Sequence, residues 1–173
     1  KRKSFVRVMQ TFSCLLMERA KECLELMALT ADVERRVFAH HFDGPTPSAV
    51  RLLHYPAFKV VTREKVWAAE HTDISLISLI ACPWMEGGDP ECYVRGLEVS
   101  DGQGGWLAIK MPRKSVLVRV GDLLQNTSNG YFKSAIFRIK ATGVMEQIDR
   151  YSIELYCHPK GDTDLAPLPC FVK

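Results

Sequence analysis

The sequence predicts a mainly β protein, an antiparallel sandwich or barrel, preceded by two α-helices. Three observations support this fold class. Apolar residues recur at helical spacing near the N-terminus, short β-rich runs follow Pro47, and turn signals separate those runs. Because little helix lies between the runs, an antiparallel arrangement is favoured over a parallel sheet.

The first predicted helix runs from Thr11 to about Leu29. Its apolar residues return every three or four positions among charged ones, which is the pattern of a helix with one buried face. A second helix is predicted from Thr30, whose side chain can cap the first turn, to the stop signal Asp43-Gly44-Pro45.

The predicted strands are short runs rich in β-branched and other apolar residues. Turn residues at Asp101-Gly102, Gly121-Asp122 and Ser128-Asn129-Gly130 separate several of them. The predicted strands are Ala49–Tyr55, Ile74–Ala81, Tyr93–Val99, Trp106–Ile109, Ser115–Val120, Ser134–Lys140 and Tyr151–Cys157.

The chain length and net charge limit the possible domain organisation and the possible functions. The 173 residues are enough for one structural domain, in which residues 1–48 form a helical segment packed on a β barrel made by residues 49–173. The 23 Lys and Arg against 20 Asp and Glu leave a net charge of +3, too small to predict nucleic-acid binding. No apolar run approaches the roughly 20 residues that cross a bilayer, so no membrane role is expected. No feature indicates a protein partner.

The six cysteines form no Cys-x-x-Cys pair, so a zinc site is not expected. With no signal peptide visible, we expect reduced cysteines in a cytoplasmic protein.

The segment His71-Thr72-Asp73 carries the first chemical signal. In an extended chain, residues two apart face the same side, so His71 and Asp73 can present an imidazole and a carboxylate to one point. Such a pair, with a distant histidine, makes the metal site of non-haem iron(II) oxygenases. A solvated strand end explains the same three residues without a metal.

Further motifs follow one another in a fixed order. This succession resembles the isopenicillin N synthase-like family of iron(II)/2-oxoglutarate dioxygenases over about residues 49 to 160. The motifs are Arg51-Leu52-Leu53-His54-Tyr55-Pro56, His71-Thr72-Asp73, Gly121-Asp122-Leu123-Leu124-Gln125, Ser128-Asn129-Gly130, Lys133-Ser134 and Arg150-Tyr151-Ser152.

The resemblance implies a double-stranded β-helix, or jelly-roll barrel, with iron(II) and 2-oxoglutarate as cofactors. It gives His71 and Asp73 as metal ligands. It also gives Arg150 and Ser152 as the pair that holds the far carboxylate of 2-oxoglutarate, with Tyr55 as a further co-substrate contact. The chemistry is suitable, because an arginine fork grips a carboxylate through two parallel charge-assisted hydrogen bonds.

Two positions depart from the family pattern. Leu53 stands where the family has an asparagine near the co-substrate, and Phe137 stands where it has the distal metal histidine. A phenyl ring has no lone pair for iron, so metal binding is expected to be weak or lost. Two functions therefore remain open. One is a dioxygenase that oxidises a small-molecule substrate, and the other is a non-catalytic relative that acts as a ligand-binding or interaction protein.

Overall fold

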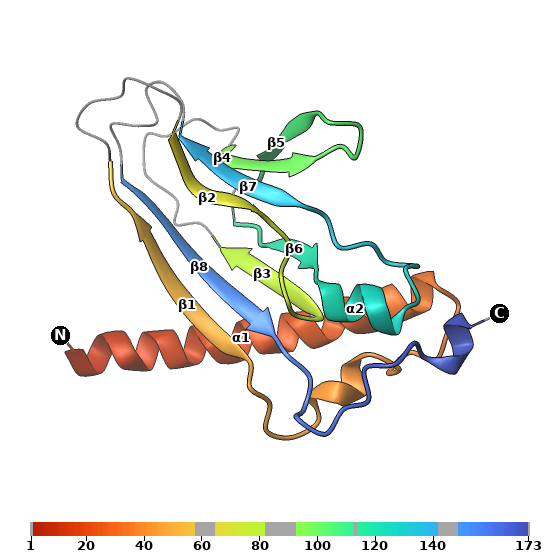
Figure 1. Ribbon diagram of the computed structural model, residues 1–173. Helices are drawn as coiled ribbons and strands as arrows, with labels where there is room; N and C mark the ends of the chain where they lie inside the picture. The colour runs from red at the N-terminus through yellow and green to blue at the C-terminus, as the bar shows by residue number, and fades with distance from the viewer. Residues whose placement is uncertain (1, 58–64, 82–92, 113, 142–148, 173) are drawn as a thin grey trace.

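The computed structural model describes residues 2–57, 65–81, 93–112, 114–141 and 149–172. Within these ranges a long helix precedes eight strands, with one short helix between the sixth and the seventh (Figure 1). The elements are α1 (Arg2–Thr30), η1 (Ala39–Phe42), β1 (Ala49–Tyr55), β2 (Lys65–His71), β3 (Ile77–Ala81), β4 (Tyr93–Ser100), β5 (Trp106–Lys110), β6 (Leu117–Val120), α2 (Asp122–Thr127), β7 (Phe137–Ala141), β8 (Arg150–Cys157) and η3 (Pro169–Phe171).

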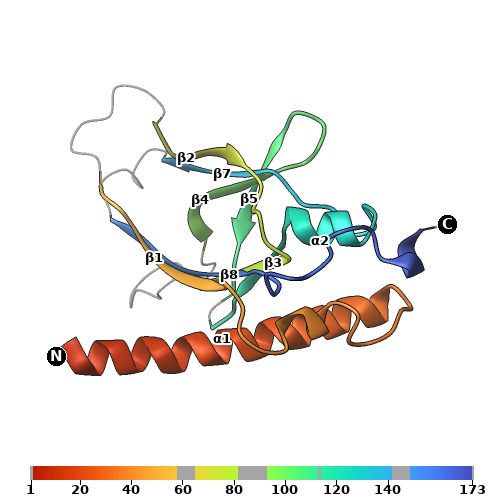
Figure 2. The same ribbon diagram turned by 60° about the horizontal axis from the view of Figure 1, so that its bottom comes forward.

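The strands form two four-stranded sheets that face each other. One sheet has the order β1-β8-β3-β6, the other has the order β2-β7-β4-β5, and every pairing is antiparallel. Helix α1 lies along the outside of the first sheet (Figure 2). The predicted fold class, a mainly β antiparallel barrel preceded by two α-helices, is confirmed except for the second helix. In the described ranges no helix is long and apolar enough to cross a membrane.

Two apolar clusters stabilise this arrangement. The four fully buried residues of α1, namely Leu16, Ala20, Leu24 and Ala28, recur every fourth position and pack against the first sheet. A second cluster fills the space between the sheets around Ile80, Leu97, Met111, Phe137 and Ile139. Phe137, which stands where the family pattern has a metal histidine, is therefore a core residue.

The predicted strands match the observed ones with three exceptions. The strand predicted from Ser134 begins three residues later, at Phe137. The strand predicted from Ile74 begins instead at Ile77, because residues 72–76 carry the chain from the second sheet to the first. Strand β2 was not predicted, because Lys65–His71 contains two alanines and two charged residues and has little of the strand-typical alternation.

The second predicted helix is replaced by turns and by the four-residue 3-10 helix η1. The Thr30 hydroxyl donates to the carbonyl of Met27 and so belongs to the end of α1 instead of capping a new helix. Asp32 then has a positive φ of 54°, a left-handed conformation that ends helices.

The buried His41 of η1 predicts a loss of stability in mild acid. It is only 6% exposed, and burial lowers its pKa from 6.5 to about 4. The unfolded chain therefore binds more protons than the folded chain below pH 6.5. The free energy of unfolding is expected to fall as the pH drops from 6.5 toward 4, by up to about 3 kcal/mol.

Urea unfolding of the wild type and of His41→Gln over this pH range measures the effect. The variant should lose much of the pH dependence, while His40→Gln, at the exposed neighbouring position, should retain it. Equal pH profiles for wild type and His41→Gln would assign the acid sensitivity to other groups.

Candidate functional site

Strand β8 places three polar side chains on its inner face. The three residues alternate along the strand with more exposed ones, so their side chains share one face. The exposed fractions are 4% for Arg150, 1% for Ser152 and 4% for Glu154. The Arg150 Nη1 donates to the Ser152 hydroxyl at 3.4 Å. The spacing of two residues thus brings the predicted co-substrate pair to one buried face.

Tyr55 joins this pair from the neighbouring strand. In the antiparallel pairing of β1 with β8, Tyr55 lies opposite Arg150, and the guanidinium carbon is 4.7 Å from the centroid of the tyrosine ring. Burial raises the pKa of Tyr55, so its hydroxyl stays protonated and able to donate. The three residues predicted to hold 2-oxoglutarate are therefore side by side.

The predicted metal residues are not on one strand. His71 is the last residue of β2 in the second sheet, whereas Asp73 lies in the crossing segment and contacts the first sheet. His71 is exposed but its ring packs against the buried Phe137, whereas Asp73 is itself only 4% exposed. The chain leaves β2 after His71, so the two predicted ligands come from different segments.

His71 packs against the residue that replaces the distal histidine. It lies opposite Phe137 in the pairing of β2 with β7, and the ring centroids are 4.2 Å apart. Its Nδ1 is 2.6 Å from the carbonyl oxygen of Ala69. Because a carbonyl only accepts, Nδ1 carries the proton and Nε2 keeps the lone pair.

Asp73 is bound by two donors from the first sheet. Its Oδ2 lies 2.6 Å from Nη2 of Arg119, and the Ser78 hydroxyl donates to the same oxygen. Arg119 also donates through Nε to the Ser78 oxygen at 3.1 Å and lies 3.4 Å from Oε2 of Glu154. The buried carboxylate is therefore neutralised by an arginine of β6.

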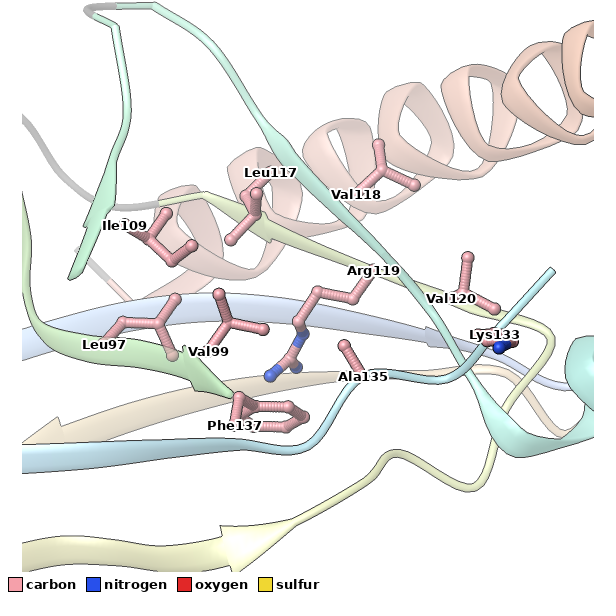
Figure 3. Close-up of a pocket in the computed structure, with 10 residues that line it drawn as sticks. All are labelled: Leu97, Val99, Ile109, Leu117, Val118, Arg119, Val120, Lys133, Ala135 and Phe137. Atoms are coloured by element: carbon pink, nitrogen blue, oxygen red, sulfur yellow. The ribbon is translucent and has the colours of Figure 1, made fainter. Parts of the chain in front are cut away.

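The Arg119 guanidinium rests on the ring of Phe137. Its central carbon is 3.7 Å from the ring centroid, and Figure 3 shows the side chain reaching from β6 toward that ring. The contact is a cation–π interaction between two largely buried groups. Phe137 thus contacts both the His71 ring and the Arg119 guanidinium.

These contacts form one polar chain between the sheets, from Arg150 through Ser152, Glu154 and Arg119 to Asp73. The Ser152 hydroxyl donates to Oε1 of Glu154 at 2.9 Å, and the Tyr156 hydroxyl donates to Oε2 at 2.6 Å. Two guanidinium groups and two carboxylates balance each other in charge.

The motif analysis missed Arg119 and Glu154. The sequence held one signal for each residue. Arg119 is a charged residue inside the apolar run Leu117–Val120, and Glu154 follows the Arg-x-Ser pair by two residues, on the same strand face.

An iron(II) site of three protein ligands does not fit these residues. In the part of the chain that the structure describes, no three His, Cys, Asp or Glu side chains come close enough to hold a metal ion. His54, a histidine near the co-substrate end, pairs instead with Asp149 at 3.0 Å. Asp73 already has an arginine where a metal would need to approach.

An open pocket of about 230 Å³ lies beside Arg119 and Phe137 (Figure 3). Most of its wall is apolar, with Lys133 and Arg119 as the charged members. The lining residues are Leu97, Val99, Ile109, Leu117, Val118, Arg119, Val120, Lys133, Ala135 and Phe137.

A two-sheet β barrel with an inward Arg-x-Ser pair on its last strand defines the class of protein. The family model of the 2OG-Fe(II) oxygenase superfamily matches residues 46–159. The chain belongs to this superfamily, which confirms the predicted family. The predicted cofactors, iron(II) and 2-oxoglutarate, are those of the superfamily as its name gives them.

Named relatives and solved structures agree with this assignment. Gibberellin 2-beta-dioxygenase 1 of Pisum sativum is 28% identical over 98% of this chain and 50% of its own length. Gibberellin 2-beta-dioxygenase 2 of Arabidopsis thaliana is 30% identical over 91% of this chain and 44% of its own length.

A full-length Neurospora crassa protein, crystallised in complex with alpha-KG, superposes with a TM-score of 0.82 at 26% identity, over 97% of this chain and 50% of that one. A 2OG-Fe(II) oxygenase family protein from Caulobacter crescentus gives a TM-score of 0.80 at 27% identity, over 99% of this chain and 52% of that one. The jelly-roll prediction is thereby confirmed. The chain spans about half the length of the curated relatives it matches.

Proposed function

We propose that this chain is the co-substrate-binding jelly-roll of a dioxygenase-like protein that acts on a small molecule, and that it binds 2-oxoglutarate through Arg150, Ser152 and Tyr55. One observation carries the proposal: these three residues converge on one buried face although Tyr55 is far from the other two in sequence. The succession of motifs in the sequence predicts the same three residues.

The three side chains suit the far carboxylate of 2-oxoglutarate. Arg150 supplies a buried positive charge and a planar pair of donors, and Ser152 and Tyr55 each supply a hydroxyl. The Ser152 hydroxyl, which now donates to Glu154, can rotate toward a bound carboxylate.

The substrate class is proposed only as a small molecule. Two relatives are named for gibberellin, and the Neurospora crassa protein has also been crystallised with 5-formyluracil, so the jelly-roll does not by itself fix the substrate. The largely apolar pocket beside Phe137 is the place we propose for it.

Calorimetric titration with 2-oxoglutarate tests the co-substrate site. The wild type is expected to bind one equivalent, and Arg150→Met is expected to lose about 10- to 100-fold in affinity, the usual cost of removing a charged hydrogen-bonding partner. Arg35→Met, which removes the same charge from an exposed position at the end of the helical segment, should bind like the wild type.

Absence of 2-oxoglutarate binding to the folded wild type would remove this part of the proposal. Equal loss in Arg150→Met and Arg35→Met would show that only overall charge matters.

A second candidate function is 2-oxoglutarate or dicarboxylate binding without turnover. The specific observation that favours it is the metal side of the barrel, where Phe137 and Arg119 stand against Asp73. Measurement of succinate release in the presence of iron(II) and oxygen separates the two candidates, because only the dioxygenase consumes the co-substrate.

A further inference from the structure

We propose that the guanidinium of Arg119 takes the place of the metal ion in this chain, so that the centre carries a built-in cation and does not take up iron(II). The inference concerns only the metal side of the proposed site, and it favours the second candidate function, binding without turnover. It does not depend on whether Arg150 and Ser152 bind 2-oxoglutarate.

Asp73 is a buried carboxylate. A carboxylate that is 4% exposed needs a compensating positive charge, because removing it from water costs several kcal/mol. Arg119 provides that charge at 2.6 Å, and the Arg119 side chain is itself only 12% exposed. The pair is therefore a buried ion pair and not a surface contact that solvent screens.

The space around Oδ2 of Asp73 is already occupied. A first-row divalent metal binds a carboxylate oxygen at about 2.0 to 2.2 Å. The Asp73 Oδ2 already receives Nη2 of Arg119 and the hydroxyl of Ser78. A metal at this oxygen would meet the guanidinium at close range, and two cations there would repel each other.

Arg119 is held in this position by the sheet. In the pairing of β3 with β6, Arg119 lies directly opposite Ser78, and its Nε donates to the Ser78 oxygen. The flat face of the guanidinium is covered by Phe137 and one edge reaches Glu154. Strand register, a hydrogen bond and an aromatic ring thus fix the cation between two carboxylates.

Arg119 and the departure at Phe137 suit each other chemically. An imidazole at position 137 would be a second base beside Asp73, whereas a phenyl ring offers a guanidinium an attractive face. Phe137 and Arg119 are therefore complementary, and restoring a histidine at position 137 alone leaves the arginine in the way.

Iron(II) titration under anaerobic conditions tests the proposal, with calorimetry as the readout and no activity required. The wild type and Phe137→His should both show no one-to-one binding. The double variant Phe137→His/Arg119→Gln should bind iron(II) at least about 10-fold more tightly than Phe137→His, because His71, Asp73 and the new histidine then lack the competing cation. Addition of iron(II) should also raise the melting temperature of the double variant alone.

Ile136→His/Arg119→Gln is the matched control, since Ile136 is 46% exposed and a histidine there points away from Phe137. It should not gain metal binding. One-to-one iron(II) binding by the wild type, or strong binding by Phe137→His with Arg119 intact, would overturn the proposal. If the double variant does not fold, those two proteins still decide the outcome.

The result is distinguishable from failure of the proposed function. Loss of 2-oxoglutarate binding with no iron(II) uptake would remove the co-substrate site and leave the role of Arg119 standing. Stoichiometric iron(II) uptake together with 2-oxoglutarate binding would remove the role of Arg119 and leave the co-substrate site standing.

Discussion

Replacing Arg119 by leucine is expected to lower the free energy of unfolding by about 3 to 5 kcal/mol, the range found when one partner of a buried ion pair is removed. The variant would leave Asp73 and Glu154 buried without their shared cation. Denaturant unfolding at neutral pH, followed by circular dichroism, measures the change.

A double-mutant cycle shows whether the loss comes from the Asp73 contact. The loss of unfolding free energy in Asp73→Leu/Arg119→Leu should be smaller than the sum of the losses in the two single variants. In the double variant no unpaired charge remains at position 73. Arg35→Leu, whose exposed ion pair with Glu25 is solvent-screened, should cost under about 1 kcal/mol. A similarly small loss in Arg119→Leu would mean that Asp73 does not depend on the arginine.

Phe137→Ala is expected to cost about 3 to 5 kcal/mol in free energy of unfolding, the range for removing a buried aromatic side chain. Phe137 is 5% exposed, belongs to the cluster between the sheets, and contacts both the His71 ring and the Arg119 guanidinium. The loss therefore combines a cavity with a missing cation–π contact.

The neighbouring Ile136→Ala provides the control. Ile136 is 46% exposed and precedes the strand, so its truncation should cost under about 1 kcal/mol. If Phe137→Ala were as mild as Ile136→Ala, the ring would be loosely packed, and its role as the cover of Arg119 would fail.

The placement of the proposed co-substrate residues was predictable from the sequence in part, because it depends on local geometry. Arg150 and Ser152 lie two apart on one strand, and that spacing alone puts them on one face. Tyr55 could be added only through the family resemblance, since its position opposite Arg150 is a matter of strand pairing.

The arrangement around the predicted metal ligands could not be predicted from local spacing. His71 and Asp73 are also two apart, but the chain changes sheets between them, and no local pattern marks that crossing. Arg119 reaches Asp73 from a strand much further along the chain, through the register of β3 with β6. The family pattern identified the lost ligand at Phe137 but contained nothing that predicted an arginine in the place of the metal.

The prediction of a second helix was wrong for a local reason. The Thr30 side chain had two possible partners, the first turn of a new helix or the last turn of α1, and in the structure it binds the latter. Sequence patterns do not decide between these two hydrogen bonds.

Calorimetric titration of 2-oxoglutarate into the wild-type chain, once with EDTA and once with excess Mn(II), tests most directly whether this jelly-roll holds its co-substrate with Arg119 in the place of a metal. Because Arg150, Ser152 and Tyr55 supply the contacts and the metal position already has its cation, the two affinities are expected to agree within about 3-fold, less than 1 kcal/mol. Binding in Mn(II) but none in EDTA would contradict this, since it would require a metal to bridge Asp73 and the ligand.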